Sequence, residues 1–395
     1  NVSYLAEGLV EEAARETGID RIELRRRNAI PKEAFPYKTP IPISTYDSGD
    51  PAGLLDDVLR LAQWDSFASR REQSKKQGKL RGLACSLFVE PAGAGGSPKE
   101  EVDIRFGASG EASIYAVCGP SGQGHETVYP EVMAEIVGVD PELITLRAGD
   151  PDGPPVMGDG TIGSRSMMAY GGAIAVAARE IVRKAQDLAA KDLEVSPSDV
   201  EFSNGTFRVK GTDLSVTMTQ IMKKHGPALN TKGDTPQPRS FPSGAHVAEV
   251  EVDPETGRVE VLAYYAVDDC GRVINHVLLE GQVHGGIVQG LGQGMGEHAV
   301  YDDTGQLLTA SFMDYAMPRA DEQPAMTLRD RPIPSPNNPL GVKGAGEAGT
   351  TGAVPTVSNA VIDALRPLGI HHLEFPFSPS RVWAAIREAG SQRQK

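Results

Sequence analysis

Over residues 1–81, apolar residues recur mainly at helical spacing. A helix is predicted almost from the first residue because one apolar stripe contains Leu5, Ala6, Leu9, Val10 and Ala13. Asp20 followed by Glu23 resembles a capping box and predicts a short helix to about Asn28. Asp50 can cap a further helix over 51–64. We therefore expect residues 1–81 to form a helical and extended connecting segment.

The periodicity changes at Gly82, where alternating apolar positions predict strands. Residues 82–90 form one strand, and residues 101–118 form a hairpin that turns at 107–110. A glycine loop follows, and then a helix over about 126–137 and a strand over 143–149. The predicted order is hairpin, glycine loop, helix and strand.

A similar order returns later in the chain. Residues 246–267 predict two strands around a turn at Thr256-Gly257, and a loop and a Gly-Gln helix follow. Asn204-Gly205 predicts a further hairpin with a type I′ turn. Proline-rich residues 226–243 favour a boundary, which gives a first half at 82–240 and a second half at 241–395. A tandem duplication stays open, because the two units share little identity.

The most informative feature of the composition is its glycine content. The 395 residues include 44 glycines, which gather at 119–124, 158–172, 281–296 and 341–352, beside predicted helices. Glycine lets backbone approach a ligand closely, so the clusters indicate binding loops. The formal charge of −14 argues against a nucleic-acid or anionic-membrane surface. Three cysteines cannot build a disulfide framework or a four-cysteine metal site, and no apolar run reaches membrane-spanning length. We expect a soluble, cytoplasmic protein.

The clearest local signal is GDGTIGSRSM at 158–167, a glycine-rich loop that leads into an alanine-rich helix. The exposed N–H groups of a helix start suit a phosphate, with Ser164 or Ser166 at the cap. Arg165 would add charge-assisted hydrogen bonds if it pointed inward. The alternative is an ordinary serine-capped helix after a flexible loop. The segment is neither a Walker motif nor a dinucleotide fingerprint.

Two further glycine clusters are ambiguous. In SGQGHET, Gly122 and Gly124 flank Gln123, whose amide can donate to and accept from a flat ligand. His125 and Glu126 read as the start of a helix, and no metal site is predicted, because HExxH is absent. EGQVHGGIVQGLGQG at 280–294 would be a poor helix by propensity. Its glycines fit either tight helix packing or contact with a ligand.

The last cluster places Glu347 among small residues, with Lys343 four residues before it. A helix is predicted from about Pro355. Small neighbours would let a substrate approach the carboxylate, and burial would raise its pKa toward the range of a general base. The alternative is a solvated turn.

In this order, the clusters resemble the molybdenum-cofactor-binding large subunits of the xanthine dehydrogenase, aldehyde oxidase and aerobic carbon monoxide dehydrogenase family. The resemblance spans essentially the whole chain and is carried by ELRRRNAIP, GQGHET, GDGTIGSRSM, EGQVHGGIVQGLGQG and GVKGAGEAGTTGAVPTVSNAVIDAL. It implies an α+β fold of two related mixed α/β halves that enclose molybdopterin, in bacteria usually as the cytosine dinucleotide.

The resemblance also implies roles for individual residues. Glu347 matches the glutamate that deprotonates a molybdenum-bound hydroxyl before that hydroxyl attacks an electron-poor carbon, with hydride passing to a sulfido ligand. The residues that match segments holding the pterin, its pyrophosphate or the dinucleotide are Gly122, Gln123, Gly124, Thr161, Gly163, Ser164, Arg165, Ser166, Gln282, Lys343 and Gly344. The implied reaction is hydroxylation of an aldehyde, an N-heterocycle or a similar carbon with water, or oxidation of carbon monoxide.

One departure from the family pattern concerns completeness. In the family, a glycine-rich loop with a glutamine near molybdenum and an AYR-type substrate loop precede ELRRRN, and neither occurs before Glu23 here. We therefore expect either a fragment or a split subunit whose molybdenum site is completed by an upstream segment or a companion chain. Iron–sulfur and FAD subunits are the expected electron acceptors. The competing hypothesis is a cofactor-free fragment or paralogue that serves in subunit assembly.

Overall fold

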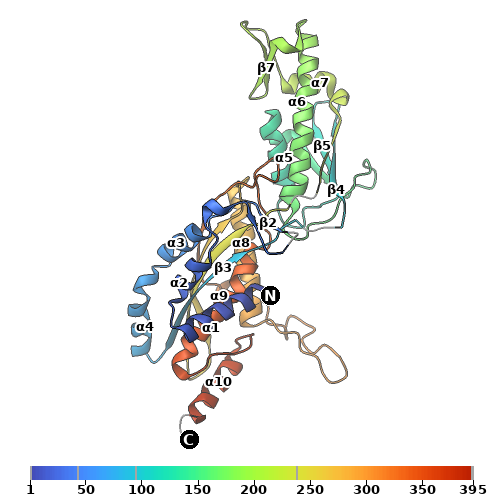
Figure 1. Cartoon of the computed structure of the whole chain (residues 1–395). Coiled ribbons are helices and arrows are strands. Elements are labelled where there is room, and N and C mark those ends of the chain that lie inside the picture. The colour runs from blue at the N-terminus through green and yellow to red at the C-terminus, as the bar shows by residue number, and fades with distance from the viewer. Residues whose placement is uncertain (1, 42–43, 94–95, 237–238, 393–395) are drawn as a thin grey trace.

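The computed structural model describes residues 2–41, 44–93, 96–236 and 239–392. Figure 1 shows an elongated molecule, with α6 (Gly172–Asp192) and α7 (Met218–His225) toward one end and α4 (Phe67–Lys76) and α10 (Pro379–Gln392) toward the other. Two four-stranded sheets form its two lobes. The expected mixed helix and sheet architecture is confirmed.

The first sheet has the strand order β10-β4-β5-β6 and contains β4 (Lys99–Phe106), β5 (Ala112–Ala116), β6 (Ile144–Ala148) and β10 (Thr231–Pro236). The second sheet has the order β13-β12-β11-β3 and contains β3 (Leu80–Val89), β11 (Ser243–Val252), β12 (Val259–Asp269) and β13 (Ala325–Asp330). From β10 to β6 and from β3 to β13, the pairings run antiparallel, antiparallel and parallel. The two sheets therefore share one topology.

Each sheet is covered by an equivalent pair of helices. The first sheet packs against α5 (His125–Val137) and α6, and the second packs against α8 (His276–Met295) and α9 (Ala348–Leu365). Gly233 in β10 lies so close to α6 that a Cβ would sit 2.3 Å from the Ala173 carbonyl oxygen. Gly82 in β3 meets α9 in the same way, with its Cβ position 2.0 Å from the Ala360 carbonyl oxygen. This correspondence supports the duplication that the sequence left open.

The sheets do not follow the predicted boundary between the halves. The strand β3 falls within the predicted first half, 82–240, but it pairs with β11 along its whole length. The strand β10 lies within the predicted first half and closes the first sheet beside β4. Each unit thus takes its fourth strand from the segment that precedes or follows it. Sequence order alone does not reveal which segment supplies the fourth strand.

The local turn and cap predictions agree with the structure. The strands β4 and β5 form the expected hairpin, and Asn204-Gly205 turns between β7 (Val200–Ser203) and β8 (Thr206–Val209), which β9 (Ser215–Thr217) extends. Asp20 caps α2 (Arg21–Asn28), and Asp50 caps α3 (Pro51–Leu61). The small pair β1 (Tyr37–Lys38) and β2 (Thr45–Tyr46) lies in the connecting arm.

The predicted first helix is present, but its apolar stripe is not the face that the fold buries. In α1 (Val2–Thr17), Leu5 is 63% exposed and Leu9 is 70% exposed, whereas Glu7 and Glu11 are buried. The reason is Arg25 of α2, whose buried guanidinium donates to Glu7 and lies 3.0 Å from Glu11. A buried cation has to be paired, and this pairing overrides the apolar stripe.

The segment between α8 and β13 is mostly irregular, and an isolated bridge joins Tyr301 to Leu307 within it. Phe312 and Met313 in this segment are 80% and 92% exposed. Among the described residues, we find no helix with the length and apolar character that crossing a membrane requires.

Candidate functional site

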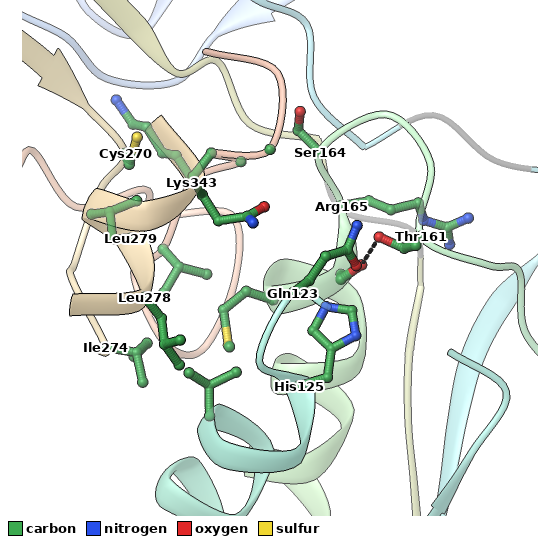
Figure 2. A pocket seen from close by; sticks show the side chains of 18 of the residues that line it. Gln123, His125, Thr161, Ser164, Arg165, Cys270, Ile274, Leu278, Leu279 and Lys343 are labelled. Carbon is green, nitrogen blue, oxygen red and sulfur yellow. Dashed lines mark hydrogen bonds between the residues drawn. The ribbon is translucent and has the colours of Figure 1, made fainter. Parts of the chain in front are cut away.

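A cavity of about 480 Å³ lies where loops of the two lobes meet (Figure 2). Every sequence-predicted site residue except Gly122 and Gly124 lines it: Gln123, Thr161, Gly163, Ser164, Arg165, Ser166, Gln282, Lys343, Gly344 and Glu347. The structure therefore brings together loops that are more than two hundred residues apart in sequence. One wall is apolar, with Ile274, Leu278 and Leu279 facing Thr161 across the space in Figure 2.

Ser164 connects three parts of the site. Its Oγ accepts a hydrogen bond from the backbone N–H of Glu347 at 3.0 Å and lies 2.9 Å from Glu347 Oε2. The same Oγ lies 2.5 Å from Oε1 of Glu90, the residue that directly follows β3. Ser164 has a left-handed backbone, with φ of +52°. One serine hydroxyl thus holds two carboxyl groups together.

Glu347 is the N-cap residue of α9, which begins at Ala348 and not at the predicted Pro355. Pro355 is tolerated inside the helix although it cannot donate to the Thr351 carbonyl. Ser3 Oγ of α1 donates to that oxygen at 3.0 Å instead. The helix can therefore start one residue after the glutamate and fix its backbone. The Glu347 side chain is exposed in this chain, so the expected burial is not observed.

The glycine at 344 allows the last loop to touch the Ser164 loop. A Cβ at Gly344 would lie 2.5 Å from the Ser164 carbonyl oxygen and 2.6 Å from the Ala92 Cβ. The Gly344 N–H donates to Ser240 Oγ at 3.2 Å. Gly93 N–H donates to the Gly163 carbonyl at 2.9 Å and holds the other side of the Ser164 loop. Any side chain at 344 would separate the two loops.

The two basic side chains predicted to face a ligand are already paired within the protein. Arg165 is buried and pairs with Glu100 and Asp159, and Figure 2 shows its guanidinium extending away from the apolar wall. Lys343 Nζ donates to Asp269 at 2.6 Å and to the Ser48 carbonyl at 3.0 Å, where both charged side chains are fully buried. The condition set for Arg165, that it point inward, is therefore not met, because Glu100 and Asp159 hold its charge.

Ser166 is at the cap position, as predicted, but its side chain does not cap the helix. The helical segment after the loop begins with a π-helical turn over Met167–Gly171, and Ser166 makes no side-chain capping bond. Its Oγ donates instead to Thr161 Oγ1 at 2.9 Å, which closes the loop on itself. The bond between Ser166 and Thr161 thus stabilises the shape of the loop, and the loop lines the cavity.

Gln123 and His125, at the start of α5, line another part of the cavity. Gln123 Oε1 is buried and has no hydrogen-bond partner among the described residues. His125 stacks on Tyr129, and Gly119 O lies 2.9 Å from its Nδ1. Burial lowers the pKa of His125. Gly124 leaves room for Leu278, whose methyl groups would lie 2.8 Å from a Cβ there. Among the described residues, no group of His, Cys, Asp and Glu side chains is arranged to hold a metal ion.

The glycine-rich helix α8 serves packing more than direct ligand contact. A Cβ at Gly290 would lie 2.6 Å from Ala353 Cβ of α9, and one at Gly286 would lie 3.1 Å from Gly349 Cα. Gln282, on an earlier turn of α8, reaches the cavity. Of the two alternatives for this segment, helix packing therefore accounts for Gly286 and Gly290.

Three polar residues at the site were not predicted: Glu90, Arg272 and Asn275. Asn275 caps α8 and donates to Glu131, and Arg272 pairs with Glu135, so both join α8 and its preceding loop to α5. Asn275 could have been found as the N-cap three residues before Leu278. Glu90 ends an apolar strand without any motif, and only the tertiary contact with Ser164 marks it.

Known proteins match this chain over nearly all of its length. It is 35% identical to the carbon monoxide dehydrogenase large chain of Hydrogenophaga pseudoflava, over 98% of this chain and 50% of that protein. It is also 35% identical to the nicotine 6-hydroxylase large subunit of Paenarthrobacter nicotinovorans, over 96% of this chain and 49% of that protein. The chain thus spans about half the length of these curated relatives.

The fold agrees with the same relatives. The structure of reconstituted CO dehydrogenase from Oligotropha carboxidovorans superimposes with a TM-score of 0.91 at 33% identity, covering 99% of this chain and 51% of that one. The molybdopterin cofactor-binding domain family matches residues 57–324, which contain the first sheet, all of the second sheet except β13, and most of the cavity loops. The chain belongs to the molybdopterin cofactor-binding domain family.

Proposed function

We propose that this chain is the molybdopterin-binding portion of a molybdenum hydroxylase, in which Glu347 acts as the general base. The observation that carries the proposal is the placement of Glu347 at the wall of the cavity, where Ser164 contacts both its backbone N–H and its carboxylate. A carboxylate held beside a cavity is the group that base catalysis needs. Relatives in both comparisons carry oxidoreductase names, which favours this function.

The residues present fit a large cofactor with a flat, polar ring system. Gln123 Oε1 is a buried acceptor without a partner among the described residues, and Gln282 supplies a second amide at the cavity. The loop Thr161–Ser166 lines the space, and Gly344 leaves no side chain there. We assign these residues to the pterin and its phosphates, and the cytosine dinucleotide form is part of the proposal. Arg165 and Lys343 would act indirectly, by holding the loops.

The chemistry assigned to the protein is proton transfer and shielding. The reaction converts substrate and water into hydroxylated product, two protons and two electrons. Molybdopterin, when bound, supplies the two-electron redox chemistry. Glu347 accepts a proton from the attacking oxygen, and Ser164 fixes the position of its carboxylate. The apolar wall at Leu278 and Leu279 keeps water from one side of the cavity.

The substrate class and partners extend the proposal beyond this chain. The relatives are named for carbon monoxide and for nicotine, so the shared fold serves chemically different substrates. We propose an aldehyde, an N-heterocycle, a similar electron-poor carbon or carbon monoxide. The names "large chain" and "large subunit" support further subunits, and we propose that these carry iron–sulfur clusters and FAD. Three cysteines in this chain are too few for a four-thiolate cluster.

Replacing Glu347 with Gln in the complete enzyme tests the assignment. Because the amide cannot accept the proton, kcat should fall by roughly two to four orders of magnitude. The molybdenum content should stay at the wild-type value, since Ser164 can still hold the amide. Steady-state kinetics together with metal analysis measure both quantities.

The matched control is Glu72→Gln on α4, which removes an exposed glutamate outside the cavity. It should leave kcat unchanged. Turnover near the wild-type rate in Glu347→Gln would refute the base assignment.

A further inference from the structure

Glu90 is a buried acid that has no ion-pair partner among the described residues. It is 7% exposed, and its Oε2 has no hydrogen-bond partner among the described residues. Within the described part of the chain, no Lys, Arg or His nitrogen lies within ion-pair distance of its carboxyl group. An ionised, unpaired carboxylate in such a place is strongly unfavourable.

The hydrogen-bonding capacity of Ser164 also indicates that Glu90 is not ionised while Glu347 is. A serine hydroxyl donates one hydrogen bond and accepts two. The Glu347 N–H occupies one acceptor position, and the carboxyl oxygens of Glu90 and Glu347 lie at 2.5 Å and 2.9 Å. If both carboxyl groups were ionised, the single hydroxyl hydrogen could serve only one of them. The other negative oxygen would then face a lone pair at hydrogen-bond distance.

We propose that Glu90 is a positioning residue that carries a proton and, by donating it to Ser164 Oγ, directs the serine hydrogen to the Glu347 carboxylate. The chain of hydrogen bonds then runs from the Glu90 carboxyl through Ser164 to Glu347 Oε2. Every contact at Ser164 is satisfied in this arrangement. The protonation of Glu90 can be measured on this chain alone, whereas its effect on catalysis rests on the proposed function of Glu347.

The electrostatic surroundings support the protonated form. Burial raises the pKa of Glu90 to about 7, opposed by the hydrogen bond with Ser164 and reinforced by the charges of Glu347 and Asp268. Asp268 at the end of β12 pairs with His246 of β11, at 3.1 Å. The thiol of Cys270 also lies close enough for its pKa to respond to Glu90, and burial raises that pKa well above the usual range.

The charge state of Glu90 sets the direction of the expected pH effect. Below its pKa, Glu90 is neutral and donates to Ser164. Above it, the ionised carboxylate competes for the serine hydrogen and places a second negative charge near Glu347. Glu347 then loses a hydrogen bond and the position that this bond fixes. Ionisation of Glu90 should therefore weaken the base at alkaline pH.

Infrared difference spectroscopy on this chain tests the protonation directly. We expect a protonated-carboxyl C=O band that disappears with a midpoint near pH 7 and shifts when the chain carries ¹³C-labelled glutamate. Glu90→Gln should remove this band. A band set that is the same in wild type and in the folded Glu90→Gln chain would overturn the proposal.

Glu347→Gln is the second variant, and it leaves Glu90 in place. Because the charge of Glu347 raises the pKa of Glu90, the midpoint of the band should move to lower pH when that charge is removed. If Glu90→Gln does not fold, this shift decides the question. An unmoved midpoint, or no band at all at pH 6, would contradict the arrangement.

The assembled enzyme provides the functional readout. In wild type, kcat should fall about tenfold between pH 6 and pH 8, the effect of losing one hydrogen bond to a charged group. In Glu90→Gln the ratio of the two rates should approach one, because the amide keeps a donor for Ser164 at every pH. An unchanged pH profile in that variant would sink the positioning role. If Glu347→Gln keeps its turnover while the infrared band behaves as expected, the proposed function fails and the protonation of Glu90 stands.

Discussion

At the residue scale, the polar side chains around the cavity are mostly committed to one another. Arg165 pairs with Glu100 and Asp159, and Lys343 pairs with Asp269. These buried pairs hold the two glycine loops in shape, so their removal should affect stability before it affects chemistry. Glu347 differs from them because its carboxylate is exposed at the cavity.

Lys343→Met tests the structural role of the buried pair. The substitution leaves Asp269 buried without its cation, and we expect a loss of about 3–5 kcal/mol in the free energy of unfolding. Urea unfolding measures it. The double variant Lys343→Met/Asp269→Leu should recover part of the loss, because no buried charge is left unpaired.

An exposed lysine gives the comparison. Lys99 pairs with Asp234 at 3.0 Å with 38% of its side chain exposed, so Lys99→Met should change the stability by less than about 1 kcal/mol. Equal losses in Lys343→Met and Lys99→Met would show that burial of the Lys343–Asp269 pair does not matter.

At the scale of elements, glycine decides how closely helices and strands approach. Gly82 and Gly233 admit α9 and α6 onto their sheets, and Gly290 admits α9 onto α8. Elsewhere on α8, Gly285 has open space around its Cβ position. Glycines of one helix should therefore respond to substitution in opposite directions.

Alanine at positions 290 and 285 tests this difference. Gly290→Ala should destabilise the chain by about 1–3 kcal/mol, because the new methyl would collide with Ala353. Gly285→Ala should stabilise it by about 0.5–1 kcal/mol, because alanine favours the helix and meets nothing. Thermal and urea unfolding of the two variants give the sign of each effect. The same sign in both would contradict the packing of α8 on α9.

At the scale of the whole molecule, two lobes of one topology contribute loops to one cavity. The chain covers about half of the two curated relatives named above, so a complete active site is a property we propose only for the larger assembly. The cavity walls come from both lobes. The loop that contains Ser164 and the loop that contains Gly344 depend on each other for their positions. Ser164 contacts both Glu347 and Gly344 at this junction.

The isolated chain should therefore bind molybdopterin incompletely and show little turnover. Elemental analysis for molybdenum and chromatography of released cytidine nucleotide would measure its cofactor content. We expect substoichiometric values for the isolated chain and full values for the assembly. Full cofactor loading together with turnover by the isolated chain would contradict this expectation.

Local chemistry made part of the fold predictable. Asp20 and Asp50 cap helices because their side chains reach backbone N–H groups a few residues away, and Asn204-Gly205 adopts the positive φ values of its turn. Such contacts lie within four residues, so the sequence displays them directly. The start of α9 was missed, since the contact of Ser3 with Thr351 lies outside any local window.

By itself, the sequence determined the order of the elements and the glycine loops, and its family resemblance implied that Glu347, Ser164 and Gln123 belong to one site. Only the tertiary structure decided which side chains face the cavity and which strands share a sheet. Arg165 and Lys343 pair with buried carboxylates, and β3 pairs with the distant strand β11. The physical reason is the same in both cases. Buried charges and strand edges must find partners, and here those partners come from distant parts of the chain.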